Sequence, residues 1–170
     1  RRHGSAGIQA GTGIGDTSIT GSTFSDHTGG SAVSVYSSTS ATFSGNTCDN
    51  NQYGCCSLTG GDVAFTNNTL DNNALAQGAA MGSVSVSGNL TLSGNTVSGP
   101  PRLFWLYGTV RNSLTLDSGL GAYGVDGLTF AAGTTLTVPP GVVVKSGQSY
   151  ATLLVHGTLN AQGTADDPVV

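Results

Sequence analysis

The phrase ATFSGNTC, residues 41–48, decides the fold because it recurs three more times before residue 100. The other copies are TSITGSTF (17–24), VAFTNNTL (63–70) and LTLSGNTV (90–97), so successive copies start 24, 22 and 27 residues apart. The third position is always large and apolar, the fifth and sixth hold mostly turn formers, and the seventh is always Thr. A period of about 20 to 50 residues is typical of repeat architectures, in which each period forms one unit that stacks on the next.

The composition predicts strands rather than helices. Apolar residues make up 37% of the chain and alternate with Thr and Ser in short runs that Gly, Asn and Asp interrupt. Such alternation is typical of strands, and the scarcity of Lys, Glu, Gln and Arg disfavours helix. A second, weaker phrase precedes the first, as GGSAVSV (29–35) and QYGCCSL (52–58). We therefore predict an all-β chain with two or three short strands in each period.

If each period forms one full turn of a coil, equivalent positions stack about 4.8 Å apart along the axis. The expected columns are Ile19, Phe43, Phe65 and Leu92 in one interior stack; Phe24, Cys48, Leu70 and Val97 in a second; and Asn46, Asn68 and Asn95 at a corner. Asn tolerates the left-handed backbone of a sharp corner, and its amide can bond the Asn above and below. We interpret all three columns as structural.

The charge content disfavours several classes of partner. Only 8% of residues are charged, the formal net charge is -4, and Lys145 is the single lysine. Nucleic-acid binding requires clustered Lys and Arg, which five scattered basic residues do not supply. No apolar run approaches the roughly 20 residues that span a bilayer, so we expect neither nucleic acid nor membrane insertion. The chain starts at Arg1 and ends on DDPVV, so we expect a piece of a longer protein.

The chain divides into three segments. Residues 1–99 carry the repeat and form the predicted first stack. Residues 100–113, PPRLFWLYGTVRNS, interrupt it, since proline lacks a donor for the strand ladder, and we expect a junction or a cap there. Its part RLFWLYGTV (102–110) is expected to be a strand or a segment that caps the end of the first stack. Within it, Trp105 and Tyr107 are interpreted as burial or capping residues, with a carbohydrate-binding platform as the alternative. Residues 114–170 have more closely spaced strands and begin the predicted second stack.

Two groups of phrases resemble a known family. The corner G-N-T with its flanking apolar residues, over about 17–99, resembles the coil consensus of right-handed parallel β-helix proteins, the pectin-lyase-like superfamily. LTFAAGTTLTVPPGVVVKSG (128–147) and LLVHGTLNAQGTADDPVV (153–170) resemble the opening coils of β-helix domains in large secreted bacterial proteins. The resemblance implies a right-handed parallel β-helix of roughly seven coils. It also implies a structural or adhesive role in a secreted or surface-anchored bacterial protein.

Many members of this superfamily act on polysaccharides, so a polysaccharide lyase or hydrolase, or a carbohydrate-binding fragment, is the alternative function. Lyases of the family resemble one another in clustering acidic residues around Ca²⁺ beside a basic residue. Here Asp49, Asp62 and Asp71 lie in predicted turns, and Arg102 and Arg111 follow the first stack. Three carboxylates without a neighbouring base are better explained as solvated turn residues.

Hydrolases of this fold resemble a pattern of paired aspartates with NTD and GHG phrases. The adjacent acids Asp166 and Asp167 lie in TADDPV, NTD is absent, and His156 lies in VHGT. Two carboxylates could flank a glycosidic bond, but adjacent residues in a strand point to opposite faces. We therefore expect no catalytic residues and no cofactor.

The three cysteines leave alternatives open. Cys48 occupies an interior stack position and is expected to be a small buried apolar side chain. Cys55 and Cys56 align with an Ala-Val pair of the preceding period, so one is expected to face in and the other out. A bridge from Cys48 to either of them fits the spacing, and three cysteines leave one unpaired. A metal site would require a further ligand nearby.

Two surfaces are further candidates for contact. The unfinished strand at DDPVV suggests open strand edges, which can pair with another chain. We therefore expect copies of this chain, or adjacent β-helix modules, to associate end to end. An ice- or crystal-binding face is a third hypothesis. It requires a regular Thr-x-Thr array on several successive coils, of which the sequence shows isolated pieces such as TTLTV.

Overall fold

The computed structural model describes residues 7–13, 15–74, 80–99, 103–146 and 151–169. These residues form strands joined by turns, together with one short 3-10 helix, η1 (Ser118–Leu120). Every strand pair among them is parallel. Parallel neighbours reached by one circuit of the chain make a solenoid, so the predicted all-β parallel β-helix is confirmed. No described helix is long and apolar enough to cross a membrane.

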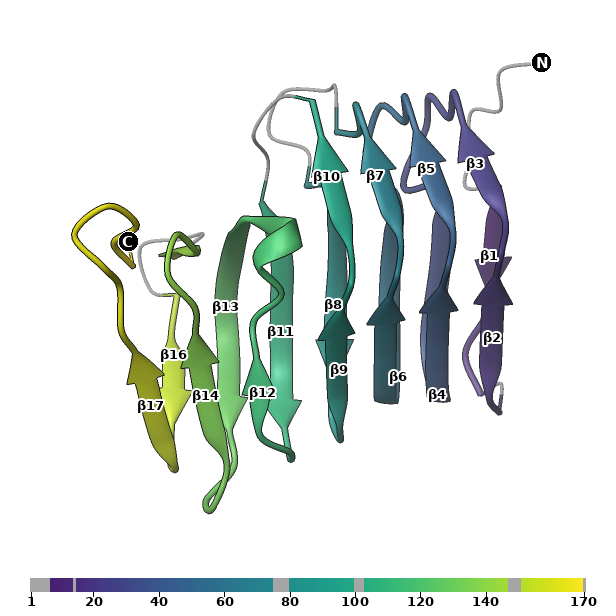
Figure 1. Cartoon of the computed structure of the whole chain (residues 1–170). Helices are drawn as coiled ribbons and strands as arrows, with labels where there is room; N and C mark the ends of the chain where they lie inside the picture. Colours follow the sequence, from purple (N-terminus) through teal and green to yellow (C-terminus); the bar gives the residue numbers. More distant parts are fainter. Residues whose placement is uncertain (1–6, 14, 75–79, 100–102, 147–150, 170) are drawn as a thin grey trace.

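One long sheet runs through the whole solenoid. Its successive rungs are β1 (Ile8–Ala10), β4 (Val33–Ser44), β6 (Cys56–Thr66), β8 (Gly82–Val86), β11 (Phe104–Val110), β13 (Ala122–Phe130) and β15 (Val143–Ser146). Three further strands pair with it, β2 (Thr17–Thr20), β9 (Leu90–Ser93) and β16 (Leu153–Val155). Figure 1 shows the rungs in chain order across the molecule, with the two termini at opposite ends.

Two shorter sheets complete the coils. The four-stranded sheet holds β3 (Thr23–Ser25), β5 (Thr47–Asp49), β7 (Thr69–Asp71) and β10 (Thr96–Ser98). The three-stranded sheet holds β12 (Leu114–Thr115), β14 (Thr135–Val138) and β17 (Thr158–Ala161). In the coils of β4 and β6, the first two of the three expected strands run together, and a register shift in β4 between Val35 and Ser38 marks their boundary.

The repeat phrase sets the register of the coils. Ile19 pairs with Phe43, Phe43 with Phe65, and Phe65 with Leu92. The second set, Phe24, Cys48, Leu70 and Val97, also pairs in order. Because side chains alternate along a strand, a common register places every apolar position of the phrase on the inner side.

An aromatic stack occupies the centre of the core. The rings follow one another in the order Phe24, Phe43, Phe65, Phe104 and Tyr123, with centroid separations of 6.0, 5.5, 4.8 and 6.4 Å. Phe43 and Phe65 lie within 3° of parallel, and both are fully buried. Stacked or edge-to-face aromatic pairs contribute about 0.5 to 1.5 kcal/mol beyond the area that they bury.

The segment predicted as a junction or cap contains an interior rung. Strand β11 pairs with β8 on one side and with β13 on the other, so both of its edges are hydrogen-bonded. Phe104 also continues the aromatic stack through this rung. The change of phrase near residue 114 coincides with a change of cross-section, since the four-stranded sheet ends at β10 and the three-stranded sheet begins at β12. Whether residues 1–99 and 114–170 fold as separate stacks stays a prediction.

Candidate functional site

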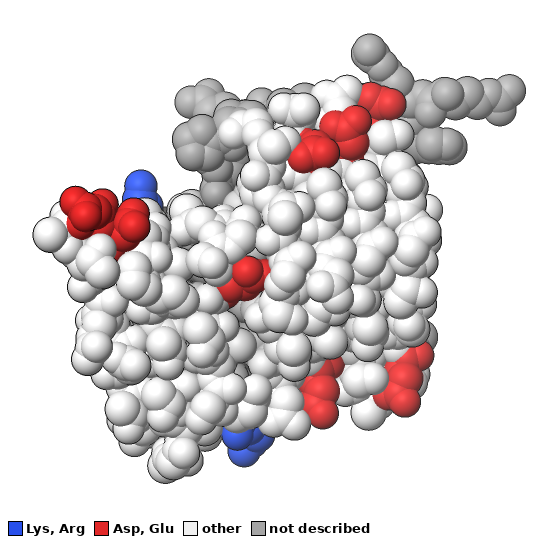
Figure 2. All heavy atoms as spheres, in the orientation of Figure 1, with Lys and Arg blue, Asp and Glu red and all other residues white. Residues whose placement is uncertain are grey.

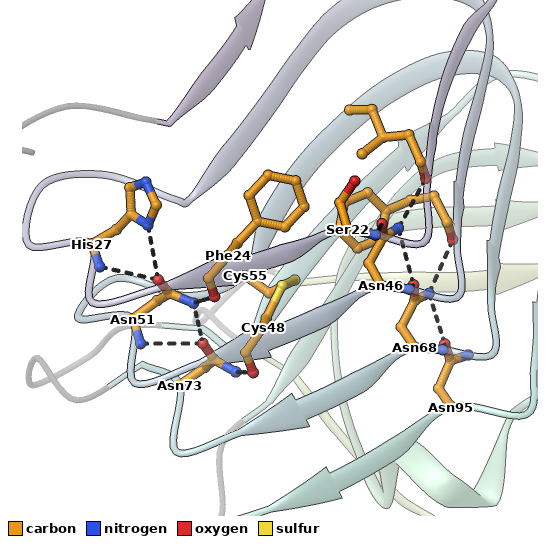
Figure 3. The surroundings of a disulfide bond; sticks show 12 residues. Ser22, Phe24, His27, Asn46, Cys48, Asn51, Cys55, Asn68, Asn73 and Asn95 are labelled. Carbon is orange, nitrogen blue, oxygen red and sulfur yellow. Dashed lines mark hydrogen bonds between the residues drawn. A yellow bond between two sulfur atoms is a disulfide. The ribbon is translucent and has the colours of Figure 1, made fainter.

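A ladder of buried asparagines forms the corner between the long sheet and the four-stranded sheet. Asn68 Oδ1 accepts hydrogen bonds from the backbone N–H of Asn46 at 2.9 Å and from its Nδ2 at 3.3 Å. Asn68 Nδ2 donates to the Phe43 carbonyl and to Asn95 Oδ1, both at 3.0 Å. Figure 3 shows Asn46, Asn68 and Asn95 one above another with these bonds. Each amide thus ties together the backbones of neighbouring coils.

Two other residue types end this ladder. At one end, the backbone N–H of Ser22 donates to Asn46 Oδ1 at 2.9 Å. At the other, Asp117 Oδ2 accepts from the backbone N–H and the Nδ2 of Asn95, both at 2.8 Å. Asp117 Oδ1 accepts from Gly119 N–H at 3.0 Å and so caps η1. A carboxylate, which only accepts hydrogen bonds, suits the last position because no further amide follows.

A second ladder, missed from the sequence, runs beside the first. Asn51 Nδ2 donates to the Phe24 carbonyl at 3.0 Å and to Asn73 Oδ1 at 2.7 Å. Asn73 Nδ2 donates to the Cys48 carbonyl at 2.8 Å. His27 ends the ladder, since its backbone N–H donates to Asn51 Oδ1 at 3.1 Å and its Nδ1 lies 3.1 Å from the same oxygen. The sequence signal was the triplet DNN after two successive copies of the phrase.

The cysteines lie next to this second ladder (Figure 3). A disulfide joins Cys48 of β5 to Cys55, which immediately precedes β6, and Cys56 is a free buried thiol. Cys55 and Cys56 are both buried, although one was expected to face out. The aligned pair of the preceding coil, Ala32 and Val33, is also fully buried, so both positions are covered in successive coils even without a disulfide. Burial raises the pKa of Cys56 to about 12, so this thiol stays protonated at neutral pH.

Trp105 and Tyr107 lie on the outer face of β11. Phe104 and Leu106, which alternate with them, are fully buried in the core. The Trp105 and Tyr107 rings lie within 14° of parallel, with their centroids 5.9 Å apart. Partial burial, and to a lesser degree the charge of the nearby Asp126, raises the pKa of Tyr107.

Three in-register columns of small side chains, here called the hydroxyl face, cover the outer side of the first four coils. The columns are Ser18, Thr42, Ala64 and Thr91; Thr20, Ser44, Thr66 and Ser93; and Thr23, Thr47, Thr69 and Thr96. All but Ala64 carry a hydroxyl and none is charged. Some hydroxyls bond along a column, as between Ser44 and Thr66 at 2.8 Å. The linear sequence shows only isolated Thr-rich pieces of these columns, because the columns become apparent only when the coils are aligned.

The sequence model of a family described as a right-handed beta helix region matches residues 2–118. The chain belongs to the right-handed β-helix family. The matched residues include both asparagine ladders and end one residue after Asp117, the last position of the first ladder. Searches of curated proteins and of solved structures gave no match.

The β-helix brings two of the candidate lyase carboxylates together and places the third elsewhere, and all three lie in strands rather than in the predicted turns. Asp49 and Asp71 are neighbours in the four-stranded sheet, whereas Asp62 lies in β6 and accepts the backbone N–H of Asn89 at 2.7 Å. Arg111 Nε donates to the Ser87 carbonyl at 2.9 Å, and Arg102 lies outside the described residues. Across the described ranges, no group of three or more His, Cys, Asp or Glu side chains is arranged to hold a metal ion.

The hydrolase-like residues also occupy turns or exposed positions in the β-helix. The backbone N–H of Asp167 donates to Thr164 Oγ1 at 2.9 Å, and the Thr164 N–H donates to the Asp167 carbonyl at 2.9 Å. These bonds form a local turn that contains Asp166. His156 is exposed immediately after β16. Figure 2 shows that charged atoms occupy little of the visible face of the molecule.

Loss of the disulfide is expected to lower the stability of the β-helix by about 2 to 3 kcal/mol, because the bridge closes a loop with a sequence separation of 7. The free energy of unfolding should be measured by urea denaturation with and without a reductant. Cys48→Ala should abolish the effect of the reductant, whereas Cys56→Ala should retain it. A reductant effect of equal size in Cys48→Ala would contradict the assignment of the bridge.

Proposed function

We propose that this β-helix is a non-catalytic structural or adhesive segment of a secreted or cell-surface bacterial protein. The observation that supports the proposal most strongly is the first asparagine ladder. It runs from Ser22 to Asp117 and hydrogen-bonds five successive coils to one another. The repeated positions of the phrase are therefore occupied by packing and corner contacts, as expected of a stiff shaft.

The mechanism is passive rigidity. In a solenoid each coil contacts only its neighbours, so the stability of the whole is approximately the sum of the coil stabilities and the interfaces between them. The ladders strengthen the interfaces between their coils with buried hydrogen bonds of side-chain amides. The hydroxyl face points outward along the shaft. The shaft therefore holds an uncharged polar surface in a constant orientation.

End-to-end association with copies of this chain, or with adjacent β-helix modules, is part of the proposal. Within the described residues, β16 and β17 pair on one side only, as do β2 and β3 at the other end. Open strand edges can pair with another chain. The large apolar residues Leu154 and Leu159, in β16 and β17, are 48% and 53% exposed.

Light scattering over a concentration series tests this association. The average mass should rise with protein concentration, and Leu154→Lys combined with Leu159→Lys should suppress the rise, because edge lysines disfavour strand pairing. Thr91→Lys, on the hydroxyl face away from these edges, is the matched control. A monodisperse monomer at high concentration would contradict the proposal.

The alternative is a polysaccharide-active β-helix fragment whose base lies outside this sequence. It should be tested by assaying acidic and neutral polysaccharides with added Ca²⁺. If the protein turns over a polysaccharide, and replacement of Asp49, Asp62 or Asp71 by Ala abolishes this turnover, the structural proposal is contradicted. The absence of turnover on every substrate would count against the enzymatic alternative.

The hydroxyl face favours a second candidate function, binding to an ordered surface such as ice. Its three columns repeat on four successive coils at the roughly 4.8 Å spacing of neighbouring strands. Thermal hysteresis should then exceed that of bovine albumin, and Thr66→Lys in the middle column of the face should reduce it. Thr158→Lys, on the exposed strand β17, should leave it unchanged. Hysteresis no greater than that of albumin would contradict this candidate.

A further inference from the structure

The coil that follows β10 lacks one strand. In the four coils before it, the corner residue of the first ladder is followed at once by a strand of the four-stranded sheet, as Asn95 is followed by β10. Asp117 takes the corner position of the next coil, but η1 follows it and leads directly into β13. This coil is short, since Trp105 pairs with Gly124, 19 residues on, whereas the copies of the phrase start 22 to 27 residues apart. Figure 1 shows β10 as the last strand of its row, with η1 in the next coil.

The edge of β10 that faces η1 is unpaired within the described residues. On the other edge, Thr96 N–H donates to the Asn68 carbonyl at 2.8 Å. The Ser98 carbonyl likewise accepts from Asn72 N–H at 3.1 Å, so Thr96 and Ser98 both direct backbone groups toward β7. Because successive residues of a strand direct these groups to opposite sides, the N–H and carbonyl of Val97 point toward η1, where no described strand pairs with them. A row of unpaired N–H and C=O groups is a template for another strand.

An apolar hollow lies beside this edge. Its volume is about 310 Å³, which is at the lower end of the range of roughly 300 to 1,000 Å³ for ligand pockets in proteins. It is lined by Met81, Val97, Leu120, Ala122 and Val143, together with the two glycines that flank Leu120. None of these side chains is charged or polar. The hollow therefore suits an apolar side chain and not a charged one.

Val97 is an interior position of the phrase that the missing strand leaves open. Its equivalents in the neighbouring coils, Cys48 and Leu70, are 0% and 1% exposed, whereas Val97 is only partly buried. Thr96 and Ser98, on either side of it, are exposed. Because side chains alternate along a strand, a strand added beside β10 would cover Val97 with its central side chain and leave its two flanking side chains in solvent.

We propose that β10 and the hollow bind an extended peptide of another chain, which adds a fifth strand to the four-stranded sheet. Its central residue is apolar and enters the hollow, and the flanking residues are polar, as in the strands TFS, TCD, TLD and TVS of this sheet. In such strand addition, main-chain hydrogen bonds supply affinity and side-chain pockets supply specificity. The site goes beyond the structural role, because a stiff shaft requires no lateral partner.

Fluorescence anisotropy of a labelled heptapeptide tests the site. The probe is TNNTLDN, the sequence of residues 66–72, because its Leu is the residue that lies beside Val97 in the register of β7 and β10. A saturable rise in anisotropy is expected on titration with the full chain. Lys in place of this Leu should weaken binding by about tenfold or more, as does the loss of a central buried anchor. No saturable rise with TNNTLDN at protein concentrations up to the millimolar range would overturn the proposal.

N-methylated peptides separate strand pairing from apolar contact. In a parallel pair, the Val97 carbonyl would accept from the N–H of the residue after the Leu, as the Ser98 carbonyl accepts from Asn72, the residue after its partner Asp71. N-methylation of the Asp of the probe should therefore weaken binding by about three- to tenfold, because it removes one hydrogen bond. N-methylation of the Leu, whose N–H would point away from β10, is the matched control and should leave the affinity unchanged. Equal affinities of these two peptides would overturn the proposal.

A variant of the protein tests the hollow itself. Ala122→Lys introduces a long charged side chain from the partly buried start of β13 and should weaken binding of TNNTLDN by about tenfold or more. Thr91→Lys, on the exposed outer side of β9, is the control and should bind normally. Circular dichroism should show that both variants fold, and the peptide variants decide the question if Ala122→Lys does not. If Ala122→Lys suppressed self-association in light scattering but left peptide binding unchanged, the occupant would be a second copy and the proposal would be wrong.

Discussion

Replacing Asn68 by Ala is expected to lower the free energy of unfolding by about 4 kcal/mol, because buried groups left without a hydrogen-bond partner cost about 1 to 3 kcal/mol each. Asn68 is 1% exposed. Its removal deprives the backbone N–H of Asn46 of its acceptor and the Phe43 carbonyl of the amide donor. Asn46 Nδ2 and Asn95 Oδ1 each lose one hydrogen bond but keep another, to the Ile19 carbonyl and from the backbone N–H of residue 68. Urea denaturation measures the change. Asn89→Ala, at an exposed turn position, is the control and should change stability little.

Asn68→Asp separates loss of donors from loss of volume. The new carboxylate could still accept from Asn46, but it would face the Phe43 carbonyl and Asn95 Oδ1 without a proton to donate. Burial beside these oxygens should raise the folded-state pKa of the new carboxyl above its usual value of about 3.9. The variant should therefore be most stable below that unfolded value and lose stability as the pH rises through the raised folded-state pKa. If the difference in unfolding free energy between the variant and the native protein did not change with pH, this account of the ladder would be wrong.

Phe65→Ala is expected to lower the free energy of unfolding by about 4 kcal/mol, since truncation of a buried Phe removes transfer free energy and leaves a cavity. Phe65 is fully buried and contacts Phe43 on one side and Phe104 on the other. Because coils of a solenoid interact only with their neighbours, a lesion in the middle of the stack should also broaden the unfolding transition. Calorimetry and urea denaturation measure both effects.

Phe24→Ala is the matched control for the core stack. Phe24 lies at the end of the aromatic stack, is 8% exposed and contacts one ring, that of Phe43. Its truncation should cost clearly less and leave the transition sharp, because only one interface between coils is weakened. An equal or larger effect at Phe24 would show that the stack does not carry stability through the centre of the molecule.

Much of the candidate site could be predicted from spacing alone. Equivalent positions of a phrase that repeats once per coil must meet, so Asn46, Asn68 and Asn95 were expected in one column before any contact was known. The second ladder could have been found in the same way, from Asn51 and Asn73 in the repeated DNN. The ends of the ladders could not be predicted in this way, because Asp117 and His27 take the place of Asn in segments whose sequence departs from the repeat.

The sequence by itself determined that the chain is all β, that each period forms one coil, and which apolar residues stack inside. These properties depend on periodicity, and periodicity can be read without coordinates. Only the tertiary structure decided that Phe104–Val110 is an interior rung, that Cys48 pairs with Cys55, and that the Trp105 indole turns one face toward Gly124. Each of these depends on a contact between positions that the repeat does not relate, so the distance between them is set by the winding of the backbone.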